Sequence, residues 1–290
     1  MIIEIESLSK WFKKKVAIDN VSLSIDKGVF GLIGKNGAGK TTLLRIIATL
    51  IPKSEGNVFI NGVSIKNAAK IRGMVGYMPQ DFAFYPGFSV YDTMKYFCTL
   101  SGVKKNCDRE ISEILEKVDL SDQVRTKVNH LSGGMKRRLG MAVALTGNPS
   151  VLLIDEPTVG LDPEERIRFR QLICDCGEEK TVILSTHIIE DVEQTCDKIA
   201  IMEDGEIIWN GSVEEAIGDM DGKVWEVCAG KNFSINGLEG PDQICLMSRT
   251  KKKEKDVVRF LSDKKVLDDA YNVTPKLEDA YVWKIIDKNQ

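Results

Sequence analysis

The sequence predicts an α/β fold whose sheet is mainly parallel. Short apolar runs at residues 29–33, 151–154 and 181–185 are the main support for this class. Continuous apolar runs of this length are typical of strands that are buried on both faces of a parallel sheet. Helix-like segments separate the runs along the chain, and this alternation is the pattern of α/β proteins.

Further segments surround these strands. Residues 2–6 read as a strand and not as a signal peptide, because they lack a basic region and a long apolar run. The runs at 199–202 and 206–209 flank Asp204-Gly205, a hairpin turn signal, so we expect an antiparallel β edge. Helical spacing without strand-like runs marks a helical insertion at about residues 88–147, for example at Ile111, Ile114, Leu115 and Val118.

The pattern changes after about residue 217. Runs at 224–228, 243–247 and 256–261 read as strands, and Thr274-Pro275 is the expected start of a final helix, with Thr274 as its N-cap. We therefore expect an α/β domain over residues 1–217, with its helical subdomain at about 88–147. Residues 218–290 are expected to form a small accessory α+β domain.

Composition excludes several classes of protein. The chain has 290 residues, a net charge of −3 and a pI near 5.7, which argues against a general nucleic-acid binder. No run approaches the roughly 20 apolar residues of a membrane-spanning helix. The 7 cysteines form no CxxC motif and predict a reduced protein with cysteine as apolar filler, although Cys174 and Cys176 leave a redox or metal pair as the alternative.

Residues 34–41 match the phosphate-loop pattern G-x4-G-K-[ST] between a predicted strand and a predicted helix. Glycines let such a loop fold around phosphates with its N–H groups inward, and the helix N-terminus adds positive potential. The lysine would contact the β and γ phosphates, and the threonine hydroxyl would ligate Mg²⁺. The predicted nucleotide-binding residues are Gly34, Lys35, Asn36, Gly37, Ala38, Gly39, Lys40, Thr41 and Thr42.

Two carboxylates end the apolar run at 151–154. Asp155 would lie at the carboxyl end of a strand, where sheets of this kind bind ligands, and it could hold Mg²⁺. Glu156 could orient or deprotonate an attacking water. The alternative is an ordinary polar turn that Pro157 terminates.

A second anion site precedes another predicted helix. Its sequence is Leu131, Ser132, Gly133, Gly134 and Met135, which offers a hydroxyl, free N–H groups and a helix N-terminus. One nucleotide does not need two phosphate-binding devices. We infer that the second device serves the nucleotide of another copy.

Together, these motifs resemble the ATP-binding subunit of an ABC transporter, which contains a P-loop NTPase core. The resemblance covers about residues 2–215 and includes six motifs in the family's order. They are the P-loop at 34–41, the Q-loop glutamine Gln80, the signature at 131–135, the Walker B strand at 151–156, the D-loop with Asp162, and the switch histidine His187.

The resemblance implies a head-to-tail dimer, formed with a second copy or a paralogous ATPase, that holds two ATP molecules between P-loop and signature. It implies that Gln80 helps to ligate Mg²⁺ and senses a transmembrane partner, and that His187 contacts the γ-phosphate and holds the geometry of Glu156 and water. Asp162 would connect the two active sites. Phe12 aligns best with the aromatic that stacks on adenine, with Trp11 as the neighbouring candidate.

Two features are similar to the ATPases of ABC-2-type exporters. They are the segment 76–81 with Tyr85-Pro86 after it, and the C-terminal segment Pro275-Lys276-Leu277-Glu278-Asp279. We therefore expect an active ATPase that drives export through a separate permease and lies at the cytoplasmic face of the cell membrane. The aromatic segment 81–88 would receive a permease helix, or would pack on the helical insertion. An importer ATPase and a soluble non-transport ABC ATPase remain alternatives.

Overall fold

The predicted parallel strands form the central sheet of a computed structural model that describes residues 2–13, 15–102, 106–229, 244–252 and 255–288. Within these residues the sheet has six strands in the order β10-β9-β3-β8-β7-β6. Strand β3 pairs in parallel with β8 and β9, and β7 pairs in parallel with β8 and β6. The bounds are Gly28–Ile33 (β3), Val75–Met78 (β6), Val151–Asp155 (β7), Thr181–Thr186 (β8), Lys198–Glu203 (β9) and Glu206–Ser212 (β10).

These strands are buried because both faces of the sheet are covered. Every residue of β7 and β8 is buried, which explains their uninterrupted apolar character. The helices of this core are α1 (Lys40–Ile47), α2 (Ala68–Arg72), α6 (Pro163–Glu179) and α7 (Ile189–Thr195). The expected α/β class and the P-loop NTPase architecture are confirmed.

The expected edge at 199–209 corresponds to β9 and β10, which are neighbours at one end of the central sheet. A second sheet, which was not expected, lies at the N-terminus. Its order is β2-β1-β4-β5, with antiparallel pairing throughout. Its strands are β1 (Ile3–Phe12), β2 (Lys15–Ile25), β4 (Glu55–Ile60) and β5 (Val63–Ser64). The apolar side chains of β1, β2 and β4 share one buried cluster with α1 and the central sheet. One continuous core therefore supports the loop between β3 and α1.

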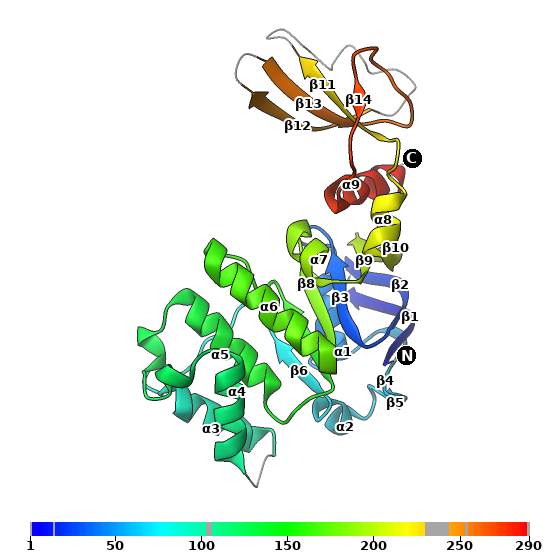
Figure 1. Cartoon of the computed structure of the whole chain (residues 1–290). Helices are drawn as coiled ribbons and strands as arrows, with labels where there is room; N and C mark the ends of the chain where they lie inside the picture. The colour runs from blue at the N-terminus through cyan, green and yellow to red at the C-terminus, as the bar shows by residue number, and fades with distance from the viewer. Residues whose placement is uncertain (1, 14, 103–105, 230–243, 253–254, 289–290) are drawn as a thin grey trace. The chain divides into compact units, whose positions relative to one another are not determined.

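The insertion between β6 and β7 is helical in the residues described. It contains α3 (Val90–Leu100), α4 (Cys107–Lys117), α5 (Gly133–Leu145) and the 3-10 turns η1 (Ser121–Gln123) and η2 (Val128–His130). Ser89 and Asp92 form a capping box that starts α3. The Lys95 ammonium lies 2.6 Å from a carboxylate oxygen of Asp108, which joins α3 to α4. The three helices lie together at one side of the sheet (Figure 1).

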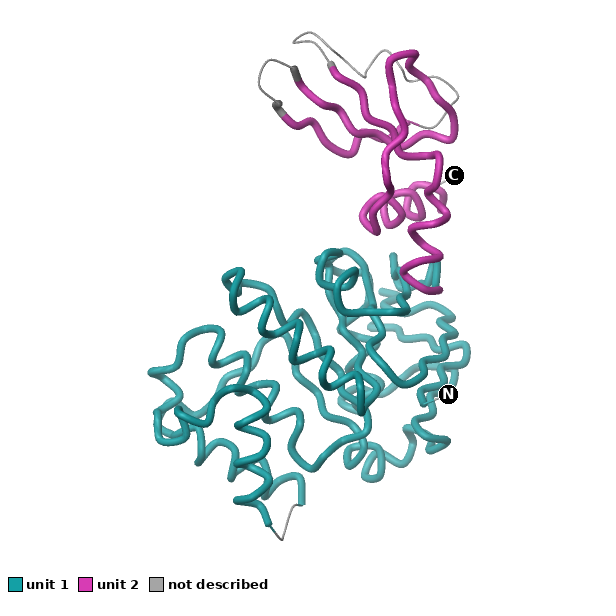
Figure 2. Tube along the Cα trace, in the orientation of Figure 1, with its two compact units in different colours: residues 1–210 teal, residues 211–290 magenta. Residues whose placement is uncertain are grey.

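The chain divides into two compact units, residues 1–210 and 211–290 (Figure 2). The second unit contains α8 (Val213–Gly218), α9 (Leu277–Lys288) and a sheet of order β12-β13-β11-β14. Its strands are β11 (Val224–Ala229), β12 (Cys245–Lys252), β13 (Lys255–Leu261) and β14 (Tyr271–Asn272). The division precedes the expected boundary at 217/218 because α8 packs with α9. Gln243, the first residue of one expected strand, lies outside the described residues.

One prediction about the second unit is wrong. The final helix does not start at Pro275 with Thr274 as its N-cap, because α9 begins at Leu277. The Asp279 carboxylate accepts a hydrogen bond of 2.8 Å from the backbone N–H of Lys276, so a side chain inside the first turn satisfies this donor. None of the helices in the described ranges combines the length and apolar character that crossing a bilayer requires.

Candidate functional site

The sheet order brings the predicted motifs to one edge. Strands β3, β8 and β7 are successive neighbours and run in the same direction, so their carboxyl ends meet. The P-loop follows β3, Glu156 follows β7 and His187 follows β8. The core thus brings together three motifs that are far apart in the sequence, at the edge where sheets of this kind bind ligands.

The P-loop follows a path that only glycine permits at several positions. Gly37 and Gly39 have φ angles of 90° and 110°, in the region that disfavours side chains. At Gly34, a Cβ atom would lie 2.2 Å from the carbonyl oxygen of Met202 on β9. Helix α1 begins directly after Gly39, so its free N–H groups face the loop. This arrangement is suited to a phosphate chain.

Lys40 lies at the bottom of the loop, with only 5% of its surface exposed. Its ammonium donates to the carbonyl oxygens of Gly34 (2.6 Å) and Lys35 (3.2 Å). It also lies 3.3 Å from Oε1 of Glu156. A single buried cation therefore joins the phosphate loop to the carboxylate after β7.

Asp155 is completely buried at the end of β7. Its Oδ1 accepts a hydrogen bond of 2.9 Å from the Ser185 hydroxyl, whereas Oδ2 makes no hydrogen bond within the described residues. Burial raises the pKa of Asp155 above its ordinary value of 3.8, while the hydroxyls of Thr41 and Ser185 oppose this rise. Buried polar atoms are normally hydrogen-bonded, so a buried carboxylate oxygen without a donor indicates a binding role.

Glu156 has a strained backbone and a shielded side chain. Its φ is 48°, an uncommon value for a residue with a side chain, and 3% of its surface is exposed. Its Oε2 lies 2.9 Å from Nδ1 of His187. The two carboxylate oxygens therefore have different neighbours, Lys40 on Oε1 and His187 on Oε2. Such strain is often concentrated at functional sites.

A cavity of about 460 Å³ opens over the P-loop. Phe12 lines it and Trp11 does not, although both aromatics are exposed. Lys15 and Ala17 of β2 also line it and were not predicted. Their only sequence signal is closeness to Phe12, because β2 begins three residues after the end of β1. The lining residues are Phe12, Lys15, Ala17, Lys35, Asn36, Gly37, Gly39, Lys40, Thr41, Thr42, Gln80 and Glu156.

Gln80 reaches the cavity from the segment after β6. Three other predicted motifs, namely the signature, Asp162 and His187, are not among the lining residues. Ser132 is the N-cap of α5, and its hydroxyl accepts from the Met135 N–H at 3.1 Å. Asp162 caps α6 and accepts from the Glu165 N–H at 2.9 Å. Both caps are exposed, so their remaining hydrogen-bonding groups are accessible from outside the chain.

The residues around Asp155 could hold a divalent cation. Hydroxyl, amide and carboxylate oxygens are the donors that Mg²⁺ prefers, and Thr41, Gln80 and Asp155 supply one of each. Among the residues described, no group of three or more His, Cys, Asp or Glu side chains could hold a metal ion by itself. A cation here would therefore share its coordination with substrate phosphates.

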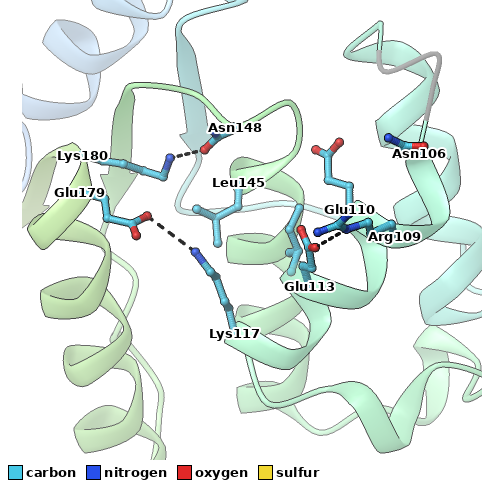
Figure 3. Close-up of a pocket in the computed structure, with 10 residues that line it drawn as sticks. Asn106, Arg109, Glu110, Glu113, Lys117, Leu145, Asn148, Glu179 and Lys180 are labelled. Atoms are coloured by element: carbon cyan, nitrogen blue, oxygen red, sulfur yellow. Dashed lines mark hydrogen bonds and ion pairs between the residues drawn. The ribbon is translucent and has the colours of Figure 1, made fainter.

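A second cavity, of about 490 Å³, lies between α4 and the end of α6. Figure 3 shows its charged side chains directed toward one another. Lys117 lies 3.7 Å from Glu179, Arg109 lies 2.7 Å from Glu113, and Lys180 donates to Asn148. The charges of these groups are thus satisfied by one another or by a neighbouring amide.

The fold and the phosphate loop define a P-loop ATPase. The ABC transporter family model matches residues 18–159. The linearmycin resistance ATP-binding protein of Bacillus subtilis is 35% identical over 76% of this chain and 72% of its own. This protein belongs to the family of ABC transporter ATP-binding proteins and is a transport ATPase.

Other similar proteins differ in the direction of transport. The Nod factor export ATP-binding protein I of Rhizobium etli is 34% identical over 82% of this chain and 77% of its own. The methionine import ATP-binding protein of Carboxydothermus hydrogenoformans is 32% identical over 85% and 75%. A dimeric ATP-binding cassette with bound ADP and Pi superposes with a TM-score of 0.66 at 26% identity, over 73% of this chain and 98% of its own.

Proposed function

We propose that this ATPase hydrolyses ATP at the composite sites of a head-to-tail dimer and drives export through a separate ABC-2-type permease. The single observation that carries the hydrolytic part is the contact of Glu156 with both Lys40 and His187 at the edge of the cavity. The direction of transport rests on the sequence features around Tyr85-Pro86 and Pro275–Asp279. The similarity to a Nod factor export protein supports it.

In this proposal each catalytic residue has one task. Lys40 neutralises the β and γ phosphates, and Glu156 accepts a proton from the attacking water. His187 orients Glu156 through the 2.9 Å contact between Nδ1 and Oε2 and faces the γ-phosphate. Thr41, Gln80 and Asp155 would hold Mg²⁺, which would neutralise charge on the phosphates. Phe12 would stack on the adenine.

The exposed signature motif supports a composite site. Ser132 and Gly133 are exposed at the start of α5 and do not line the cavity of their own chain. A partner's phosphates could therefore approach the free N–H groups of α5. The partner would be a second copy or a paralogous ATPase. Asp162, exposed at the start of α6, would connect the two sites.

An aromatic cluster supports a permease contact. It contains Phe82, Phe84, Tyr85, Phe88, Tyr96 and Phe97, whose rings pack edge-on or tilted. One part of the cluster is suited to packing on the helical insertion, and another part is suited to receiving a permease helix. Phe82 and Phe84 are half-buried, whereas Tyr85 and Tyr96 are 60% and 40% exposed. Exposed tyrosines on a packed base are suited to receiving an apolar helix. The ATPase would thereby lie at the inner face of the cell membrane.

An importer ATPase is the second candidate, because the methionine import relative aligns with 85% of this chain. The permease distinguishes the two. We would recover the tagged protein from detergent-solubilised native membranes and identify the polytopic protein that co-purifies. Recovery of an ABC-2-type permease is the expected result, and an importer permease would overturn the proposal of export. Replacing Tyr85 and Tyr96 with serine should reduce recovery, whereas the exposed Ile167→Ser should not.

The hydrolytic proposal is tested with Glu156→Gln. Removing the base should lower ATP hydrolysis by at least about 100-fold. Binding should persist, because the amide still fits beside Lys40 and His187. ATP turnover, nucleotide affinity and gel filtration with ATP would be measured together. We expect a stable ATP-bound dimer. A variant that remains monomeric and still hydrolyses ATP would contradict both the base and the dimer.

A further inference from the structure

One face of the signature helix lies along the chain segment that carries Gln80. Positions 137, 140 and 144 of α5 are three and four residues apart, so they share this face. Their neighbours are Gln80, Phe82 and Gly76, respectively. We call this line of contacts, from Gly76 on β6 to Phe82, the seam.

Two glycines make this seam close. A Cβ atom on Gly76 would lie 1.9 Å from the carbonyl oxygen of Ala144, and one on Gly140 would lie 2.6 Å from Cζ of Phe82. Backbone thus lies against backbone at one end, and the tip of an aromatic ring lies against backbone at the other. Close packing of this kind transmits displacement from one surface to the other.

Arg137 adds a polar contact at the end of the seam nearest the cavity. Its Nη1 donates a hydrogen bond of 2.5 Å to the backbone carbonyl of Gln80. Its guanidinium carbon lies 5.5 Å from the centre of the Phe82 ring. Burial lowers the pKa of Arg137, and the Asp81 carboxylate opposes this change. Hydrogen bonds from charged donors are about twice as strong as neutral ones.

We propose that Arg137 is a positioning residue that fastens Gln80 to the signature helix, so that nucleotide bound at one site sets the position at which Ser132 meets the partner's nucleotide. This inference rests on the proposed function, because it assigns Gln80 to the chain's own nucleotide and Ser132 to the partner's. It adds a physical connection between them that neither motif contains. Ser132 caps the helix that carries Arg137, so a shift of Gln80 moves the cap.

The test separates nucleotide binding from dimer formation. Arg137→Met keeps an unbranched side chain on Phe82 but removes the donor. In the Glu156→Gln background, we expect its affinity for ATP as a monomer to stay within about twofold. The ATP concentration for half-maximal dimer formation should rise by about tenfold, in line with the loss of one charge-assisted hydrogen bond. Arg137→Lys keeps one donor and should restore part of the effect.

Two further variants control for general damage. Gly140→Ala pushes on Phe82 without touching Arg137 and should also raise the ATP concentration needed for dimers. Arg109→Met removes an exposed arginine of the same helical region, which pairs only with Glu113 among the ion pairs formed by the described residues, and should change nothing. Equal ATP requirements in Arg137→Met and its Glu156→Gln parent would overturn the inference while leaving the composite dimer intact.

If Glu156→Gln forms no dimer, that result refutes the proposed function but not the connection through Arg137. A measurement on the monomer then tests this connection. ATP should change the amide hydrogen exchange of residues 132–138 in the parent chain, and this change should be lost in Arg137→Met. Exchange at the P-loop should respond to ATP in both. An unaltered response of 132–138 in the variant would overturn the connection through Arg137.

Discussion

The buried carboxylate of Asp155 is expected to lower the folding stability of the nucleotide-free protein. It is fully buried, its Oδ2 makes no hydrogen bond within the described residues, and burial raises its pKa above 3.8. A carboxylate held in this way costs folding free energy at neutral pH. The cost is consistent with a group kept for binding a cation beside substrate phosphates.

Asp155→Asn should therefore stabilise the nucleotide-free protein and abolish hydrolysis. Removing the buried charge is expected to contribute about 0.5–2 kcal/mol, as is common when a functional site is relieved of strain. For a domain of this size, each kcal/mol raises Tm by about 2–4 °C. Calorimetry without nucleotide, together with ATP turnover, would measure both effects. A lower Tm in the variant would contradict the argument.

The pH dependence gives an independent check with a definite sign. Because the pKa of Asp155 is raised on folding, the wild-type chain loses stability as pH rises from 3.8 through the raised folded value. Below 3.8 the group is protonated in both states and the cost vanishes. The difference in Tm between Asp155→Asn and wild type should be largest near pH 7 and should shrink as the pH falls. Ser185→Ala, which removes only the donor to Oδ1, should not reproduce this trend.

For single residues, the sequence predicts those site features that a short local motif contains. The P-loop and the carboxylates after β7 each depend on a few consecutive residues beside one strand, so they can be read without the fold. Lys15 and Ala17 enter the cavity through the pairing of β1 with β2, and Arg137 reaches Gln80 across the seam. Such contacts depend on three-dimensional packing. Closeness to Phe12 is the only signal for Lys15 and Ala17 in the sequence, and no local pattern signals the contact of Arg137.

Between elements, one buried carboxylate connects the segments that follow three motifs. Asp191 on α7 is 1% exposed. It accepts hydrogen bonds from the Thr158 hydroxyl and from Nε of Arg166 at 2.6 Å. Thr158 follows Glu156, Arg166 lies on the helix that Asp162 caps, and α7 follows His187. The single carboxylate therefore fixes the turn after β7, helix α6 and helix α7 against one another.

Asp191→Asn should destabilise the first unit substantially. Removing the charge leaves the guanidinium of Arg166 without its buried partner, and breaking such pairs costs about 3 kcal/mol or more. The urea midpoint of the transition that ATP shifts would measure the loss. Glu190→Gln is the matched control, because Glu190 pairs with the same arginines from an exposed position on the same helix. Its loss should stay within about 1 kcal/mol, and equal losses would refute the special role of Asp191.

For the whole molecule, the division into two units depends on packing that the sequence only partly indicates. The change in pattern near residue 217 is real, but α8 belongs with the second unit because it packs on α9. Likewise, Thr274-Pro275 carries a typical start signal, yet the Asp279 side chain satisfies the Lys276 N–H and the helix begins later. At the ends of helices and domains, the contacts of neighbouring residues in the folded chain decide the boundary more than local sequence propensity does.

The second unit has a core of its own around Val227, Val258 and Phe260, and a buried ion pair fastens α9 to its sheet. Arg259 on β13 donates from Nη2 at 2.6 Å and from Nε at 3.2 Å to the two carboxylate oxygens of Asp279, which is 2% exposed. Its Nη1 also reaches Glu226 on β11 at 3.3 Å. Removing Arg259 would leave a buried carboxylate without its main partner.

Arg259→Met should therefore unfold the second unit selectively, with a loss of about 3–5 kcal/mol from its own transition. Nucleotide should still stabilise the first unit, by about 2.7 kcal/mol at a ligand concentration of 100 times Kd, because the site lies wholly within residues 1–210. Calorimetry with and without ATP in the Glu156→Gln background would resolve the two transitions. Arg249→Met, which removes a more exposed ion pair with Asp256 from the same sheet, should cost less than about 1 kcal/mol. If Arg259→Met lowered both transitions equally, the two units would fold as one cooperative body, and the second would be part of the ATPase core and not an accessory to it.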